Sequence, residues 1–194
     1  MSPIPVYLIT GFLESGKTSF IEQVILEGNF VDGEKTLLIL TEEGEVELED
    51  DLLDHYNIDV IYIEDKSEFT EEFLKKARRE HRPEQVIIEY NGMWPVSEFL
   101  KMRLPYRWEL FQIVSTVDAS TFQLYMNNMR SLMSEFLSVT GMAIFNRCDE
   151  DTDLAYLIRN IKVLNNKAEI RNIFRFSRAR KDIGIYEMLP QFNL

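Results

Sequence analysis

The chain has 194 residues, of which 45% are hydrophobic and 28% are charged, and its formal net charge is −12. This length and composition are typical of one folded domain and exclude an intrinsically disordered chain. The acidic balance repels phosphate backbones, so it excludes general nucleic-acid binding.

Short apolar runs rich in β-branched residues follow one another along the chain and predict β-strands. A strand that is apolar throughout is typical of a parallel sheet buried on both faces. The predicted strands are, in chain order, residues 4–10, 36–41, 58–64, 85–90, 111–118, 142–146 and 168–174.

Segments with helical periodicity separate these strands. We expect helices over residues 19–28, 67–81, 120–137 and 151–165, and an acidic loop running into a helix over residues 42–55. Strands alternating with helices predict an α/β fold, a three-layer sandwich with a mostly parallel central sheet. We expect one domain over residues 1–194, with any ligand bound at the carboxyl ends of the strands.

Cys148 is the only cysteine of the chain, which excludes an intramolecular disulfide and is typical of a reducing compartment. The sequence shows no secretory signal and no apolar run long enough to span a bilayer. We therefore expect a cytoplasmic protein with no membrane span. We interpret Cys148 as a small packing residue rather than as a reactive thiol.

Residues 11–18, GFLESGKT, match the phosphate-loop pattern G-x-x-x-x-G-K-[ST] at every fixed position. The loop follows a predicted strand and precedes a predicted helix, so its backbone N–H groups and the helix N-terminus can converge on an anion. This motif predicts a P-loop NTPase. We expect Lys17 to contact the β- and γ-phosphates and the Thr18 hydroxyl to bind Mg²⁺. The other expected contacts of the loop are Gly11, Glu14, Ser15, Gly16 and Ser19.

The predicted strand 142–146 runs into Asn146-Arg147-Cys148-Asp149, which is close to the N-K-x-D motif of GTPases. An aspartate here accepts hydrogen bonds from guanine that adenine cannot donate. We therefore expect Asp149 to read guanine, Asn146 to join the base-binding loops and Arg147 to lie along the base. An ordinary turn is the alternative, because Asn and Asp favour turns.

Acidic residues follow two further predicted strands and are candidates for Mg²⁺ chemistry. We expect Glu89 on the metal side and the Gly92 backbone against the γ-phosphate. Glu42 and Glu45 are expected to bind Mg²⁺, orient water or bind a second metal. Asp118 either takes a nucleotide role, shapes the sheet edge or holds a loop. The candidate catalytic residues are Lys17, Glu42 and Glu89, and the candidate metal ligands are Thr18, Glu42 and Glu89.

Together these motifs resemble the CobW/HypB/UreG family of metal-handling GTPases, and its CobW branch most closely. The segment PVYLITGFLESGKTSF is similar to that branch's P-V-x-x-L-T-G-F-L-G-S-G-K-T-T, and IIEYNGMWPV is similar to I-E-x-x-G-x-x-x-P. Further matches are EEGEVELEDDLL, STVDAS, FNRCD and VLNNKAEI. The resemblance implies slow GTP hydrolysis with Mg²⁺, coupled to delivery of Zn²⁺ or another transition metal.

Two features depart from the CobW pattern. The branch usually carries a C-x-C-C metal motif before the strand 85–90, but residues 43–90 contain no cysteine, and thiolates are the ligands that select such metals. The usual C-terminal domain is also expected to be absent. A GTP-dependent switch without metal carriage therefore stays as an alternative. A P-loop ATPase or kinase is a second alternative, because Asn146-Arg147-Cys148-Asp149 departs from N-K-x-D. The expected partners are a guanine nucleotide, a metalloprotein client and a second copy of the chain.

Overall fold

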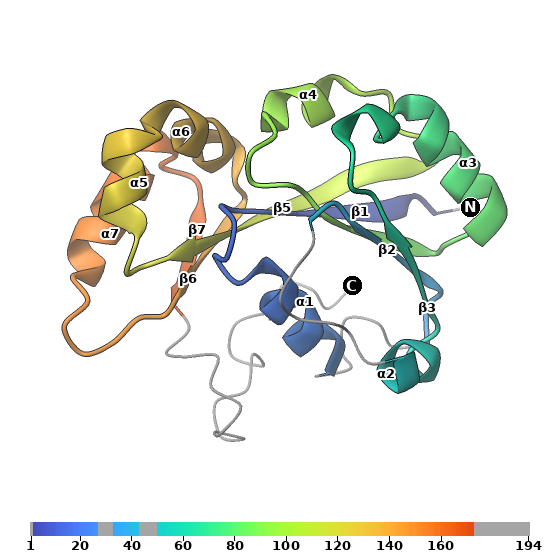
Figure 1. Ribbon diagram of the computed structural model, residues 1–194, viewed down its shortest axis with the longest axis horizontal. Coiled ribbons are helices and arrows are strands. Elements are labelled where there is room, and N and C mark those ends of the chain that lie inside the picture. Colours follow the sequence, from blue (N-terminus) through green and yellow to red (C-terminus); the bar gives the residue numbers. More distant parts are fainter. Residues whose placement is uncertain (1, 27–32, 43–49, 173–194) are drawn as a thin grey trace.

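The computed structural model describes residues 2–26, 33–42 and 50–172. Within these ranges the strands form one seven-stranded sheet in the order β3-β2-β4-β1-β5-β6-β7, and every neighbouring pair is parallel (Figure 1). The predicted strands and the predicted α/β class are confirmed. The strands are β1 Ile4–Thr10, β2 Thr36–Leu40, β3 Ile58–Tyr62, β4 Gln85–Glu89, β5 Trp108–Asp118, β6 Met142–Asn146 and β7 Glu169–Asn172.

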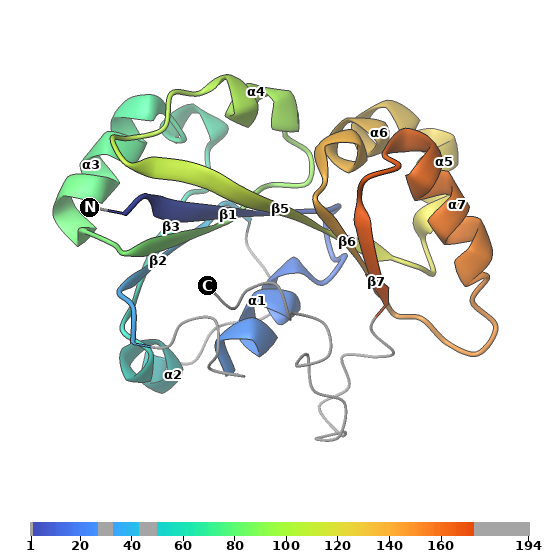
Figure 2. The same ribbon diagram turned by 180° about the vertical axis from the view of Figure 1, so that it is seen from behind.

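Helices cover both faces of the sheet, which gives the three layers. Figure 2 shows α3 to α7 together on one face, with α1 and α2 on the other. The helices are α1 Lys17–Leu26, α2 Asp50–His55, α3 Glu71–His81, α4 Val96–Lys101, α5 Phe122–Asn128, α6 Arg130–Val139 and α7 Leu154–Leu164, with a short 3₁₀ helix at Lys66–Glu68. No helix in the described ranges is both long enough and apolar enough to cross a membrane.

Two of the helix predictions are wrong in detail. The segment 67–81 was expected as one helix, but α3 begins at Glu71, where the Thr70 hydroxyl accepts the Phe73 N–H at 3.1 Å and caps it. The segment 120–137 is two helices, because Met129 has the non-helical angles φ −131° and ψ 33°. The short helix α4 was not predicted.

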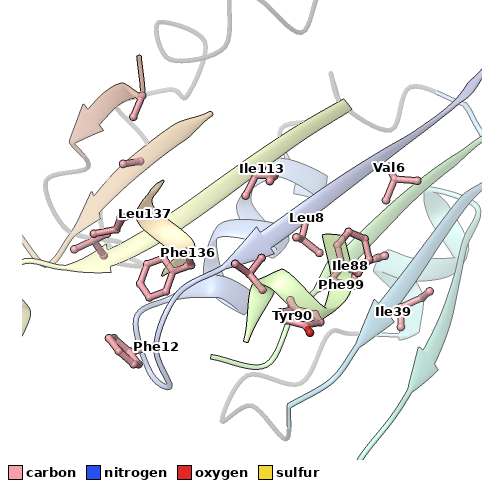
Figure 3. Close-up of a cluster of buried hydrophobic side chains, with 14 of the residues drawn as sticks. Val6, Leu8, Phe12, Ile39, Ile88, Tyr90, Phe99, Ile113, Phe136 and Leu137 are labelled. Atoms are coloured by element: carbon pink, nitrogen blue, oxygen red, sulfur yellow. The ribbon is translucent and has the colours of Figure 1, made fainter. Parts of the chain in front are cut away.

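A buried cluster between the sheet and α3 to α7 forms the larger part of the core (Figure 3). Phe12 belongs to this cluster although it lies in the phosphate loop and not in a strand or helix. Its ring stacks on Tyr125 of α5 at 4.3 Å and meets Phe136 of α6 edge-on at 5.5 Å, both between ring centroids. The loop is therefore anchored in the core by an aromatic side chain.

The parallel arrangement brings the carboxyl ends of the strands to one edge of the sheet. Ile9 at the end of β1 is in register with Glu89 of β4, which is also in register with Leu40 of β2. On the other side of β1, Asp118 of β5 is in register with Asn146 of β6. Candidate residues that are far apart in the sequence thus meet at this edge.

Candidate nucleotide-binding site

The loop between β1 and α1 is held in a conformation that needs its glycines. Gly11 has φ +140° and Gly16 has φ +95°, values that side chains rarely allow. A Cβ at Gly11 would lie 2.4 Å from the Thr116 carbonyl oxygen, and one at Gly16 would lie 2.2 Å from Asn146 Nδ2. The loop therefore packs directly against the ends of β5 and β6.

Ser15 ties the loop to the sheet through its side chain and its backbone. Its hydroxyl lies 2.7 Å from the Thr116 hydroxyl of β5, and its carbonyl accepts a hydrogen bond from Asn146 Nδ2 at 3.1 Å. Asn146 thus joins the end of β6 to the phosphate loop. The contact with Thr116 was not predicted, because nothing around this threonine in the sequence marks it.

The Lys17 ammonium is buried and points back into the loop. Its Nζ donates to the carbonyl oxygens of Gly11 at 3.1 Å and Phe12 at 3.0 Å. It also forms an ion pair with Glu42 Oε2 at 2.6 Å, in which both side chains are almost fully buried. A buried cation of this kind is suited to binding an anion that enters the loop.

Glu42 and Gly92 come together beside Lys17. The second carboxylate oxygen, Glu42 Oε1, accepts the Gly92 N–H at 2.5 Å. A Cβ at Gly92 would lie 2.3 Å from the Gly11 carbonyl oxygen, so the chain after β4 runs in contact with the phosphate loop. The structure therefore brings Lys17, Glu42 and Gly92 into one cluster. Glu45 lies outside the described residues.

Glu89, at the end of β4, faces the first turn of α1. The Thr18 hydroxyl donates to both of its carboxylate oxygens, at 2.9 and 3.2 Å. The pKa of Glu89 is raised to about 7, chiefly by burial and also by the Glu42 carboxylate, against the lowering effects of Lys17 and the Thr18 hydroxyl. The pair is an oxygen donor set of the kind that Mg²⁺ prefers.

The segment after β6 holds an ion pair that was not predicted. Arg147 has φ 54°, and its guanidinium pairs with the buried Asp118 carboxylate. The other oxygen of Asp118 accepts the Ser120 N–H at 2.8 Å and hydroxyl at 2.6 Å. Asp118 therefore holds the Arg147 side chain and the loop after β5, a role that the pairing of β5 with β6 makes possible.

Asp149 is exposed and belongs to a local turn. Its Oδ1 accepts the Thr152 hydroxyl at 2.7 Å and the Asp151 N–H at 3.1 Å. The Thr152 hydroxyl is the main cause that lowers the pKa of Asp149, so the side chain is an ionised acceptor. Asp149 serves the turn through one oxygen and stays accessible to a ligand.

The remaining predicted residues take different positions. Glu14 is exposed and has φ 60°, and Ser19 is partly buried in α1. Cys148 is buried, and burial chiefly raises the pKa of its thiol to about 11, which confirms a packing role. In the described ranges no group of three or more His, Cys, Asp or Glu residues could hold a metal ion.

Comparison with known proteins adds a family and a fold. Residues 5–172 match the family model described as CobW/HypB/UreG, nucleotide-binding domain. A curated relative, the zinc chaperone CobW of Sinorhizobium sp, is 31% identical over 103 aligned residues, and the match covers 46% of this chain and 28% of that protein.

Two solved structures have a similar fold. The Zn(II)-bound YjiA GTPase from E. coli has a TM-score of 0.66 at 22% identity, over 95% of this chain and 61% of its own. The hydrogenase maturation factor HypB from Archaeoglobus fulgidus has a TM-score of 0.66 at 17% identity, over 95% of this chain and 86% of its own. The chain thus spans less than two thirds of the curated relative and of the E. coli protein.

Proposed function

The chain belongs to the CobW/HypB/UreG family of nucleotide-binding domains, and from that premise we propose that it binds GTP with Mg²⁺ and hydrolyses it slowly. The observation that carries the proposal is the buried Lys17 ammonium, turned into a loop whose glycines leave room only for backbone. Such a loop offers main-chain N–H groups and a cation to a polyphosphate.

The residues of the phosphate side fit a nucleotide with its metal. Lys17 would hold the phosphate oxygens, and the Thr18 hydroxyl, Glu89 and Glu42 would supply the oxygen ligands of Mg²⁺. When bound, Mg²⁺ neutralises charge on the phosphates. Catalysis by Lys17, Glu42 and Glu89 would then rest on positioning and on stabilising the developing charge.

Guanine selectivity is assigned to the corner after β6. The exposed, ionised Asp149 carboxylate can accept the two donors of guanine, and Asn146 connects this corner to the phosphate loop. Arg147 would border the base with the plane of its guanidinium, in the orientation that Asp118 imposes. Adenine would leave the carboxylate without a partner.

Titration of the protein with GTP and ATP, with and without Mg²⁺, tests the proposal. Asp149→Ala should weaken GTP roughly tenfold to a hundredfold, the factor for about 1–3 kcal/mol, and leave ATP unchanged. Lys17→Ala should weaken both nucleotides. Glu150→Ala, which removes an exposed carboxylate from the same turn, is the matched control. Equal affinities of the unaltered chain for GTP and ATP would end the guanine assignment and favour the ATPase or kinase alternative.

We further propose that GTP hydrolysis serves metal homeostasis through a metalloprotein client. The name of the curated relative, a zinc chaperone, supports this role. The lack of cysteine in residues 43–90 supports the alternative, a GTP-dependent switch that carries no metal. Measuring Zn²⁺ and Co²⁺ binding with and without a GTP analogue separates the two. Tight stoichiometric binding would rule out the switch.

A further inference from the structure

Two donors of the phosphate site share one internal acceptor, the Glu42 carboxylate. Lys17 Nζ contacts Oε2 at 2.6 Å, and the Gly92 N–H donates to Oε1 at 2.5 Å. These are the ammonium and the backbone amide assigned to the γ-phosphate above. The Glu42 side chain is 6% exposed, so this carboxylate is held inside the site and not at its rim.

The contact with Gly92 sets Glu42 apart from a simple counter-ion of Lys17. Neutralising the ammonium needs one oxygen, yet the second oxygen is bound by a backbone amide on another segment. That segment touches the loop so closely that a Cβ on Gly92 would clash with the backbone of Gly11 and Phe12. Glu42 therefore bridges the loop and the end of β4, where a terminal phosphate would also have to bind.

We propose that Glu42 is an internal substitute for the γ-phosphate and sets the preference of the site between GDP and GTP. A diphosphate leaves the carboxylate in place, whereas a triphosphate must displace it from both Lys17 and Gly92. Because the displacement breaks two charge-assisted hydrogen bonds, it lowers the affinity for GTP relative to GDP. The proposal rests on the guanine-nucleotide binding proposed above and goes beyond it.

The backbone before Glu42 is fixed, so the exchange can leave β2 in place. Thr41 is buried, its N–H donates to the Glu89 carbonyl at 3.2 Å, and its hydroxyl donates to the same oxygen at 2.9 Å. The Thr41 carbonyl in turn accepts Asn91 Nδ2 at 3.0 Å. Glu42 can therefore leave Lys17 while Thr41 and β2 stay in the sheet.

Nucleotide affinities of Glu42→Gln and Glu42→Ala test the proposal. Fluorescent GDP and a non-hydrolysable GTP analogue are titrated in EDTA, which separates the displacement from any role of Glu42 as a metal ligand. In both variants the ratio of the affinity for the analogue to the affinity for GDP should be about tenfold higher than in the unaltered chain. This factor corresponds to about 1.4 kcal/mol. Glu109→Gln makes the same charge change at an exposed position of β5 and should leave the ratio unchanged.

The outcomes separate this proposal from the proposed function. An unchanged ratio in both Glu42 variants, or a ratio shifted toward GDP, overturns the role of Glu42 while nucleotide binding stands. If neither nucleotide binds the unaltered chain with or without Mg²⁺, the proposed function itself has failed.

The Gly92 amide gives a second readout that does not depend on how stable the variants are. Asn91-Gly92 is the only Asn-Gly pair in the sequence, so ¹³C-carbonyl asparagine with ¹⁵N-glycine labels a single peptide bond. Its amide proton should resonate at low field in the free and GDP-bound protein, because it donates to a carboxylate. Binding of the GTP analogue should shift the resonance of this amide proton. Identical positions with GDP and the analogue would overturn the proposal.

Discussion

Glu89 gives the chain a measurable pH dependence of stability. Its pKa is raised from 4.5 to about 7 in the fold, chiefly by burial, and its side chain contacts Thr18. The folded chain therefore holds this proton more tightly than the unfolded chain does. The stabilising effect is complete below pH 4.5 and is lost as the pH rises through about 7.

The size of the effect follows from the two pKa values. Linkage gives a loss of about 2 kcal/mol in the free energy of unfolding between pH 5.5 and pH 8 for this one carboxyl. The lower pH stays above the isoelectric point of about 4.7, where solubility is poor. The carboxylates of Asp59 and Asp65, whose pKa values are lowered by hydrogen bonds to His81 and Ser67, titrate below this window.

Urea unfolding at both pH values, in EDTA and without nucleotide, measures this loss. Glu89→Gln keeps an oxygen that can accept the Thr18 hydroxyl, but its side chain cannot ionise. The variant should therefore lack the loss of about 2 kcal/mol in the free energy of unfolding between the two pH values. The unaltered chain should therefore lose stability relative to the variant as the pH rises. Parallel pH profiles of the two proteins would refute the assignment of the raised pKa to Glu89.

Two further substitutions and one labelling experiment have defined outcomes. Gly92→Ala should lower the free energy of unfolding by about 1–3 kcal/mol in urea titrations, because the new Cβ would meet backbone atoms of Gly11 and Phe12 at 2.3 and 2.8 Å; an unchanged midpoint would contradict the close approach. Glu14→Gly should raise the free energy of unfolding by about 0.5–1 kcal/mol, because φ 60° strains a residue with a side chain more than it strains glycine. An equal or lower free energy of unfolding would count against that strain. Cys148 should react with a thiol reagent only as fast as the chain unfolds, because burial raises the pKa of its thiol to about 11; immediate labelling in native buffer would show that the thiol is accessible.

The parts of the fold that the sequence predicted are those with a local signal. The strands are apolar throughout because both faces of the sheet are covered, and the phosphate loop has its glycines and lysine within eight consecutive positions, residues 11–18. The break at Met129 was missed because the helical spacing of apolar residues continues across it, through Met126, Met129 and Met133. The helix α4 was missed because six residues are too few to show a period.

The missing parts of the site depend on contacts between distant segments. Glu42 was a candidate from its place after a strand, but nothing near it in the sequence indicates that it binds Lys17. The pairing of Asp118 with Arg147 likewise depends on the register of β5 against β6. Such contacts follow from strand order, which apolar patterns alone do not determine.

The position of β1 has a consequence for how the chain acquires its structure during synthesis. This strand is synthesised long before its partners in the sheet, since Val6 lies in register with Val86 and Ile4 with Trp108. The apolar strand before the phosphate loop must therefore wait for β4 to cover one of its edges and for β5 to cover the other. Pairing over such separations is slow and leaves nascent chains prone to aggregation. Chains cut short before β5 should accumulate as insoluble material rather than as a smaller working unit.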